Sequence, residues 1–476
     1  MMSTRRDFLK EMGMAAAGVA LGSGGKVFGQ PMTSKEWAAT KNEKVKIAYI
    51  GIGNRGEQDI DEFAKTNMVD VVALCDIDLD GPQCQKILAR YPQAKRFRDF
   101  REMFETYGNQ FDAVCAAVPD HIHFPIAMMA LKYGKHIYLE KPMTRTFLEA
   151  ELLMEASRKS PHVATQVGNQ GHSEANYFQF KAWKDAGIIK DVTAVTAHMN
   201  SPRRWHTFDP NIYKFPDADP IPKNMDWLSW PGACSFHDYS EKFHQGNWRC
   251  WYDYGMGALG DWGAHILDTV HEFMNLGLPY EITLKYTKGH NDFFYPFSST
   301  ILFRFGARGN MPPCDITWYD GIDNLPPLPK GFGASQAGTD IPTTNQGATP
   351  VSELNPGKII YTKDLTFKGG SHGSTLSIIP KEKAEEMKDK LPKIPTSPSN
   401  HYVNFLRACQ GVEKTRSPFE INGVLSQVFC LGVIAQHLNT QLFFDTRTKQ
   451  FTNNTFANAL LCGMPPRRGW EDFYKI

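Results

Sequence analysis

Short apolar runs alternate with helix-length segments between residues 45 and 167. Strands are predicted over 45–50, 71–75, 111–118, 136–139 and 163–167, and helices over 57–65, 82–90, 100–107, 125–132 and 147–158. Repeated strand–helix units favour parallel strands joined by right-handed crossovers. We therefore expect an α/β fold that begins with a doubly wound parallel sheet.

The pattern changes in the second half of the chain. Strand-like runs follow one another without intervening helices, as in an antiparallel sheet, at 281–287, 300–305, 315–319 and 358–362. The stretch 321–357 is rich in proline and glycine and predicts one long irregular loop. Three helices are expected to follow, a charged one over 381–390 and amphipathic ones over 402–409 and 425–437.

Composition narrows the class of protein. The chain has 476 residues with 52 Lys+Arg and 51 Asp+Glu, so its net charge of +1 gives no field that attracts polyanions. We expect no nucleic acid partner. The nine cysteines form no C-x-x-C pair, which argues against a disulfide framework or a structural metal site.

The N-terminus has the features of an export signal. Arg5 and Arg6 precede Phe-Leu-Lys and a weakly apolar stretch over 12–25, which is too short to span a bilayer. This looks like a twin-arginine signal, which exports proteins already folded; the alternative is a basic tail. We expect a signal segment over 1–30, a linker over 31–44, a periplasmic or cell-envelope location and no stable membrane span after export.

A glycine-rich turn joins the first predicted strand to the first predicted helix. It comprises Gly51, Gly53 and Gly56 with Asn54 and Arg55 among them. In this context a G-x-G-x-x-G turn lets a pyrophosphate approach a helix N-terminus, so these residues are expected to bind a dinucleotide.

An acid follows the next predicted strand at the spacing of a ribose ligand. Asp76 can accept hydrogen bonds from ribose hydroxyls and would repel a 2′-phosphate, which favours NAD over NADP. Asp78 is a second candidate for this contact, and a solvent-facing strand-end acid is the alternative interpretation.

Glu140, Lys141 and Pro142 lie where another strand ends, at the edge of the sheet where ligands bind. With Glu140 beside it, Lys141 is expected to contact the cofactor and to donate a hydrogen bond to a reacting hydroxyl. The alternative is a surface salt bridge between the two side chains.

A second polar cluster lies in the run 255–268. Beyond its glycines the run predicts one helix with Asp261, His265 and Asp268 on a single face. His265 can accept the proton of an alcohol, and Asp261 can bind the substrate or orient the imidazole. A structural histidine and an Asp-His-Asp metal site are the alternatives; no fourth metal ligand is evident, and we expect no metal.

Seven of the ten tryptophans gather between residues 183 and 262. Aromatic rings stack on the apolar faces of sugar rings, so Trp248 and neighbouring Arg249 are predicted to contact a ring-shaped polyol. An aromatic core or a subunit interface is the alternative interpretation, and the better one for any single tryptophan.

The glycine turn, the Glu140–Pro142 tripeptide and the run from Gly255 to His265 stand in this order at large separations. Together they resemble the Gfo/Idh/MocA oxidoreductases. The resemblance implies an NAD-binding Rossmann domain over 45–165, then an α+β domain over 166–476 with a large, open, mostly antiparallel sheet.

By the same resemblance Lys141, Asp261 and His265 occupy catalytic positions, with His265 as the base. Gln170 falls on the substrate face, and His123 falls in a cofactor-side loop at 119–123. The resemblance also implies a homo-oligomer.

These observations predict an exported NAD-dependent oxidoreductase with tightly bound cofactor. It would act on a secondary hydroxyl of a sugar, glycoside or cyclitol, for example by oxidising C3 of a glycoside to a 3-keto sugar. One alternative is a redox-neutral, NAD-dependent glycosidase that uses transient oxidation and elimination. Another, from a different class, is a non-catalytic protein that binds sugar or NAD.

Overall fold

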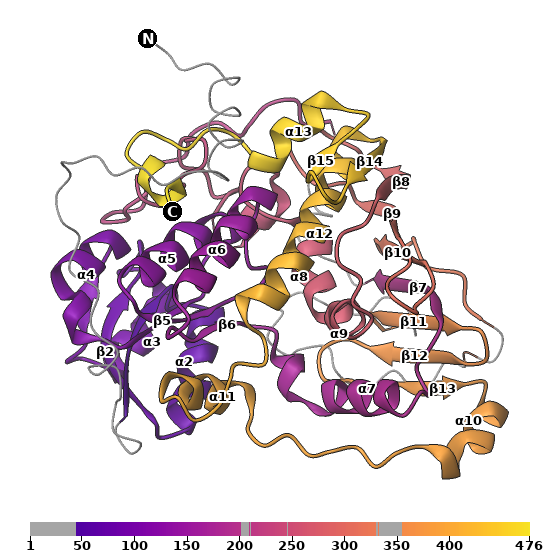
Figure 1. The fold of residues 1–476 in the computed structure, drawn as a ribbon. Helices are drawn as coiled ribbons and strands as arrows, with labels where there is room; N and C mark the ends of the chain where they lie inside the picture. The colour runs from indigo at the N-terminus through magenta and orange to yellow at the C-terminus, as the bar shows by residue number, and fades with distance from the viewer. Residues whose placement is uncertain (1–43, 201–208, 210, 245, 330–331, 333–354) are drawn as a thin grey trace, which may run out of the picture.

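The computed structural model describes residues 44–200, 209, 211–244, 246–329, 332 and 355–476. The predicted signal segment, nearly all of the linker and most of the loop predicted over 321–357 lie outside the described residues. Within the described chain two sheets lie side by side with helices between them (Figure 1).

The N-terminal sheet has six strands in the order β3-β2-β1-β4-β5-β6, and every neighbouring pair is parallel. This order is that of the dinucleotide-binding fold, and it confirms the predicted doubly wound sheet. The strands are β1 Val45–Ile50, β2 Val69–Cys75, β3 Lys95–Phe97, β4 Ala113–Ala116, β5 His136–Leu139 and β6 Thr165–Val167. The helices are α2 Arg55–Lys65, α3 Pro82–Arg90, α4 Phe100–Tyr107, α5 Asp120–Lys132 and α6 Phe147–Lys159.

Three details of this domain differ from the sequence prediction. The short strand β3 was not predicted, because two of its three residues are exposed and polar. The helix α5 begins at Asp120, although Pro125 favours a helix start. The segment that resembled a loop at 119–123 is therefore mostly the first turn of α5. The strand β6 ends at Val167, as predicted, but begins at Thr165 rather than at residue 163.

The second sheet has nine strands in the order β13-β12-β11-β7-β10-β9-β8-β14-β15. Only β7 and β10 pair in parallel, so the predicted mostly antiparallel sheet is confirmed. The strands are β7 Val192–Met199, β8 Glu281–Lys288, β9 Ser298–Phe305, β10 Cys314–Asp320, β11 Gly357–Thr362, β12 Thr366–Gly370, β13 Ser377–Ile379, β14 Gln441–Asp445 and β15 Gln450–Phe451.

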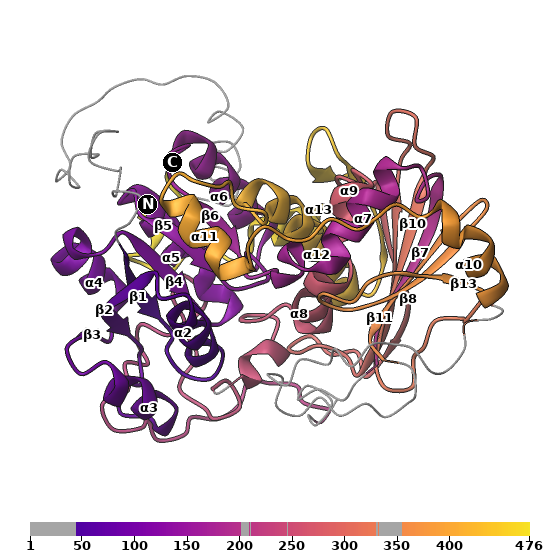
Figure 2. The same cartoon turned by 90° about the horizontal axis from the view of Figure 1, so that it is seen from below.

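Helices of the second half fill the space between the sheets (Figure 2). They include α7 Ala175–Asp185, α8 Gly257–Ile266, α9 Asp268–Phe273 and α12 Phe419–Leu438. Three further helices are α10 Lys381–Met387, α11 His401–Cys409 and α13 Thr455–Cys462. The helix α12 packs against α6 of the first domain and against α8, β8 and β9 of the second, while α11 packs against α2. The two domains therefore share a helical layer.

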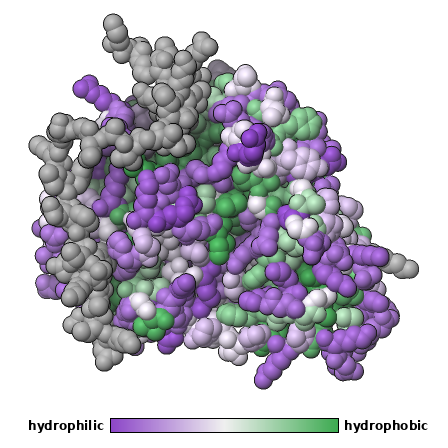
Figure 3. Space-filling view, in the orientation of Figure 1, coloured by the Kyte–Doolittle hydropathy of each residue, from purple (hydrophilic) through white to green (hydrophobic). Residues whose placement is uncertain are grey.

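The helix α12 is long and apolar enough to cross a membrane by length and composition. However, 72% of its most apolar 18-residue window is buried inside the protein, as expected for a core helix. Polar residues cover most of the described part of the face in Figure 3, with apolar residues between them in small groups.

Candidate active site

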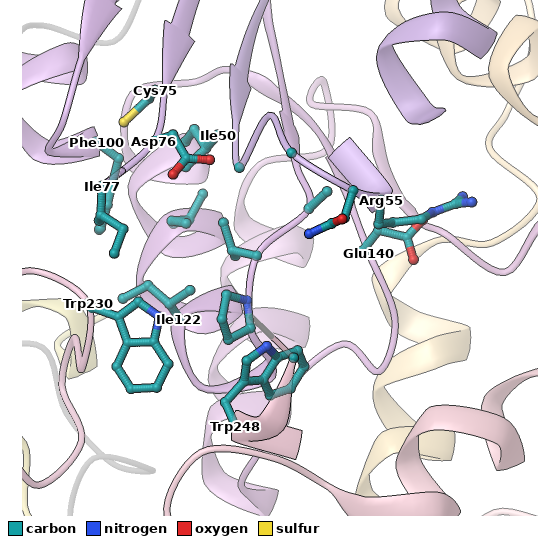
Figure 4. Close-up of a pocket in the computed structure, with 18 of the residues that line it drawn as sticks. Ile50, Arg55, Cys75, Asp76, Ile77, Phe100, Ile122, Glu140, Trp230 and Trp248 are labelled. Carbon is teal, nitrogen blue, oxygen red and sulfur yellow. The ribbon is translucent and has the colours of Figure 1, made fainter. Parts of the chain in front are cut away.

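Two cavities meet at the C-terminal edge of the parallel sheet. The larger, of about 530 Å³, lies along the ends of β1, β2, β4 and β5 (Figure 4). The smaller, of about 480 Å³, lies between α2, the turn after β6, α8 and the turn between β12 and β13. Arg55, Glu140 and Lys141 line both cavities. These side chains therefore stand between the two spaces.

The glycine turn forms one end of the larger cavity. Gly51 has φ +77°, and a Cβ atom there would lie 2.3 Å from the carbonyl oxygen of Ala117. A Cβ atom on Gly56 would lie 1.9 Å from the carbonyl oxygen of Gly51. Only glycine fits at these two positions, so the N-terminus of α2 closely approaches the turn. The N–H of Gly56 donates to the Gly53 carbonyl at 2.9 Å, and Asn54 makes no side-chain cap, so no capping side chain stands between this helix N-terminus and a pyrophosphate.

Asp76 lines the larger cavity where β2 ends. Its carboxylate accepts hydrogen bonds from the N–H groups of Ile52 and Asp78, each at 3.0 Å. A carboxylate offers about four acceptor positions, so it can also accept from ribose hydroxyls. Asp78 does not line this cavity and instead accepts a hydrogen bond from Gln83 at 2.9 Å. Of the two acids, the geometry favours Asp76 as the ribose ligand.

Lys141 is held by Asp261 rather than by Glu140. Its Nζ donates to Asp261 Oδ1 at 2.8 Å and to the Asp261 carbonyl at 3.0 Å. The side chains of the pair are only 12% and 3% exposed. An ammonium group has three N–H donors, so one remains for a ligand. The surface salt bridge considered for Lys141 and Glu140 is therefore wrong.

Glu140 pairs instead with Arg55 from the glycine turn, at 2.9 Å. The guanidinium of Arg55 also contacts Asp59 at 2.8 Å and donates to the hydroxyl of Tyr402 at 3.1 Å. Burial raises the pKa of Asp59 to about 7. The side chain of Arg55, predicted to bind the cofactor, thus also ties the glycine turn to Glu140 and to α11.

A series of alternating charges holds the second carboxylate oxygen of Asp261, the one that does not bond to Lys141. Arg249 donates to both carboxylate oxygens of Asp120 at 3.1 and 3.2 Å and lies 3.6 Å from Asp261 Oδ2. Its guanidinium stacks on Trp248, 4.2 Å from the ring centre. Arg249 was predicted to contact substrate, but its charge is already paired with Asp120 and Asp261. It also lines the larger cavity, and its contact with substrate stays a prediction.

His265 is 4% exposed, lines the smaller cavity and stacks on His372 with ring centres 3.7 Å apart. Burial, aided by the neighbouring His372 and Lys141, holds the pKa of His265 well below its ordinary value. The imidazole is therefore neutral near pH 7 and can accept a proton. Its Nδ1 has no hydrogen-bond partner among the described residues.

Asp268 does not share a helix face with His265, as the sequence had suggested. The helix α8 ends at Ile266, α9 begins at Asp268, and the Asp268 carboxylate lies 3.4 Å from His172. The three side chains of the considered Asp-His-Asp site are thus directed to different partners. No group of three or more His, Cys, Asp or Glu in the described chain is placed to hold a metal ion.

Two further predicted residues lie beside the Glu140–Lys141 turn. Gln170 lines the smaller cavity and donates to the Tyr138 hydroxyl at 3.1 Å and to Glu140 at 3.3 Å. His123 lines neither cavity; its ring contacts the carbonyls of Pro142 at 2.7 Å and Val118 at 2.9 Å. His123 therefore supports the segment that carries Glu140 and Lys141, and its direct contact with cofactor stays a prediction.

Most of the tryptophans belong to the core. The buried ones are Trp183, Trp227, Trp230, Trp251, Trp262, Trp318 and Trp470. Trp248 lines the larger cavity together with Trp230, on the side opposite Asp76 (Figure 4). Trp205, one of the seven tryptophans of the stretch 183–262, lies outside the described residues, as do its polar neighbours Arg203, Arg204 and His206. Trp248 does not line the smaller cavity, and its sugar-stacking role stays a prediction.

Sequence reasoning missed Asp120, His372 and Tyr402, all of which touch predicted site residues. His372 lies in a turn and Tyr402 in the helix α11, both far along the chain from the residues they touch. No local motif surrounds either of them. Asp120 was seen only as part of a loop. Because the predicted helix began at residue 125, the sequence did not show that Asp120 lies in the buried first turn of α5, where a carboxylate needs a charged partner.

Comparison with known proteins gives the family. Residues 45–169 match the family model of the Gfo/Idh/MocA oxidoreductases described as an NAD-binding Rossmann fold. Residues 185–304 match the model of the C-terminal alpha/beta domain of an oxidoreductase family with the same name.

Curated relatives are distant. The chain is 23% identical over 261 residues to a glycosyl hydrolase family 109 protein of Shewanella pealeana, which covers 48% of this chain and 56% of that protein. It is 26% identical over 190 residues to the inositol 2-dehydrogenase of Salmonella typhimurium, covering 39% of this chain and 54% of that protein. The chain thus spans about half the length of the curated relatives it matches.

Solved structures extend the likeness in fold. The WlbA dehydrogenase from Bordetella pertussis, crystallised with NADH and UDP-GlcNAcA, superposes with a TM-score of 0.55 at 13% identity. The match covers 85% of this chain and 99% of that one. The two family models follow each other along this chain in the expected order and together match just over half of it. The chain belongs to the Gfo/Idh/MocA family of NAD-dependent oxidoreductases, with an N-terminal NAD-binding Rossmann domain.

Proposed function

We propose that this protein uses tightly held NAD to oxidise or reduce a secondary hydroxyl of an uncharged sugar, glycoside or cyclitol. The observation that carries the proposal is the placement of Lys141, held by Asp261, between the two cavities, with His265 in the wall of the smaller one. The larger cavity would hold NAD through the glycine turn and Asp76. The smaller cavity would hold the substrate.

Each side chain has a chemical task in this arrangement. NAD, when bound, supplies a nicotinamide carbon that accepts or returns hydride. The remaining N–H of Lys141 donates to the substrate oxygen, and Asp261 keeps the ammonium in that place. The neutral imidazole of His265 accepts the hydroxyl proton during oxidation and returns it during reduction.

The charges of the smaller cavity support an uncharged substrate. Its cationic side chains already have acidic partners: Arg55 with Asp59 and Glu140, Lys141 with Asp261, and Lys65 with Glu62. Among the described residues that line it, no lysine or arginine lacks such a partner. A phosphate or carboxylate placed here would find no uncommitted cation, whereas hydroxyl groups can bond to the amide of Gln170 and to ring nitrogens.

A second reaction fits the same side chains. In a redox-neutral glycosidase, oxidation of the sugar hydroxyl acidifies the neighbouring C–H, the aglycone leaves by elimination, and water then adds before the hydride returns. The relative from Shewanella pealeana that is named a family 109 glycosyl hydrolase supports this alternative. The products distinguish the two reactions, because only the glycosidase releases free aglycone without net reduction of NAD.

We also propose that the protein acts in the periplasm or cell envelope. The sequence of the first 30 residues supports this, with Arg5 and Arg6 ahead of the short apolar stretch. Free NAD is scarce outside the cytoplasm, so an exported enzyme of this family needs a cofactor that it carries with it and regenerates during each turnover.

Replacing Asp76 with alanine should weaken NAD binding more than NADP binding. The carboxylate is expected to bond the ribose hydroxyls of NAD and to repel the 2′-phosphate of NADP. Calorimetric titration of apoprotein with NAD and with NADP measures the two affinities. Asp78→Asn is the control, because Asp78 lies outside the cavity. Equal losses for the two dinucleotides would place the ribose contact elsewhere.

Replacing His265 with alanine should lower turnover by about 10²–10⁴-fold, the usual contribution of a positioned base, and leave NAD bound. Because the pKa of His265 is depressed, its base form persists as pH falls. The wild-type rate should therefore stay level down to about pH 6.5, the ordinary histidine pKa, and decline only below it. Steady-state rates across pH measure both effects.

The matched control is His271→Gln, since His271 is a buried histidine of α9 that lines neither cavity. It should keep both the rate and the pH profile. A wild-type rate in His265→Ala would remove His265 as the base and leave Lys141 as the candidate.

A panel of uncharged glycosides and cyclitols should react at least about tenfold more efficiently than matched sugar phosphates and uronic acids. A buried anion without a free cation is costly. Reduced-nicotinamide absorbance and free aglycone, followed together, give the rates and also separate the two reactions. Preference for the anionic members would contradict the substrate class.

Changing Arg5 and Arg6 to lysine should retain the precursor in the cytoplasm in a folded, active form, because the twin-arginine route reads the arginine pair. Cell fractionation with activity assays measures this. Unchanged export of the double variant would show that another signal directs the protein.

A further inference from the structure

His372 stands beside the predicted base but comes from a distant part of the chain. It lies in the turn that joins β12 to β13 and lines the smaller cavity with His265. The two imidazole rings are nearly parallel, at 20°, with centres 3.7 Å apart. Trp262 meets the His372 ring edge-on at 5.7 Å. His372 lies beyond the residues matched by the family models, which end at residue 304.

The backbone around His372 is arranged to bring this ring close. His372 has φ +48°, a left-handed conformation that residues other than glycine seldom adopt. A Cβ atom on Gly171 would lie 3.0 Å from the His372 carbonyl oxygen, and one on Gly373 would lie 1.6 Å from the Glu174 carboxylate. The turn therefore packs closely on the segment that carries Gln170. Strained backbone of this kind persists where the surroundings enforce it, often at functional sites.

Contact with His372 also contributes to the low pKa of His265. The charged and titratable groups that act on His265 are His372, Lys141 and Arg55 from other elements and Asp261 from its own helix. Only Asp261 favours protonation of the ring. Burial, together with Lys141 and Arg55, lowers the pKa of His372 itself to about 3. Both stacked rings are thus neutral over the physiological range.

We propose that His372 is a positioning residue for His265: its stacked ring fixes the orientation of the His265 imidazole and excludes water from one ring face, which keeps His265 an unprotonated acceptor. The part that His265 then plays in catalysis rests on the proposed function. The physical effect on His265 does not depend on any substrate.

The first test measures the pKa of His265 directly by an NMR titration. The sample is histidine-labelled protein with its bound cofactor. The His265 signal is assigned by its loss in His265→Ala. Wild type, His372→Ala, His372→Phe and the control Ser374→Ala, from the same turn, are compared. In His372→Ala water reaches the exposed ring face, so the pKa of His265 should rise by about one unit or more, toward about 6.5. His372→Phe preserves the aromatic contact and should keep the low value, as should Ser374→Ala.

An unchanged His265 titration in a folded His372→Ala protein would overturn the proposal. The proposal would also be overturned if the pKa of His265 rose as much in His372→Phe as in His372→Ala. That result would show that the nitrogens of His372, rather than a stacked ring, keep the pKa of His265 low. Circular dichroism establishes folding, and the phenylalanine variant retains the packing if the alanine variant unfolds.

The second test uses turnover. In His372→Ala the acid limb of kcat/KM should move to higher pH in step with the NMR titration, so the loss of activity should be larger near pH 6 than near pH 8. His372→Phe should restore the wild-type profile. An acid limb that stays in place while the His265 titration moves would contradict the role of His265 in the proposed function and leave the positioning role of His372 intact. Absence of both shifts would overturn the inference itself.

Discussion

The contact between Lys141 and Asp261 is the interaction on which the site depends. Lys141 follows the last residues of β5 in the Rossmann sheet, and Asp261 belongs to α8 of the second domain. Removing both charges from water is unfavourable, and a buried pair is tolerated only when its remaining hydrogen-bonding groups are also satisfied. Here Lys141 bonds to two oxygens of Asp261, while Arg249 and Asp120 extend the series of alternating charges. These charges can pair in this way only when the two domains have the relative placement seen here, so the series helps to specify that placement.

The parts of the site that sequence reasoning identified are those that a local pattern specifies. Gly51 and Gly56 are required by close backbone approaches within one strand–turn–helix unit, and that unit is visible in the sequence. Lys141 follows a strand, and the end of a parallel strand points to the ligand edge. In each case the residue and the element that positions it are neighbours along the chain.

The parts that were missed or misjudged depend on contacts between distant segments. The pairing of Arg249 with Asp120 was missed because the two residues are 129 positions apart along the chain. The separation of Asp268 from His265 results from a break at Leu267, between two helices that the apolar pattern runs together. The tryptophan-rich stretch was ambiguous for a similar reason: its composition suits both sugar stacking and a core, and only packing distinguishes them. The fold class could thus be argued from periodicity, whereas the charge partners could not.

The position of Arg55 has a consequence for how long a dinucleotide stays bound. The first turn of α2 is fastened through this side chain to Asp59, Glu140 and Tyr402, so the floor of the larger cavity is tied to α11. On the opposite side, the N–H of Asp226 donates to the carbonyl of Ile77 at 2.9 Å, joining the Trp230 segment to the strand end that carries Asp76. A ligand in this cavity would therefore lie between segments that are tied to one another on two sides. Where release of a ligand needs such segments to separate, the barrier to dissociation can be high even if the equilibrium contacts are ordinary.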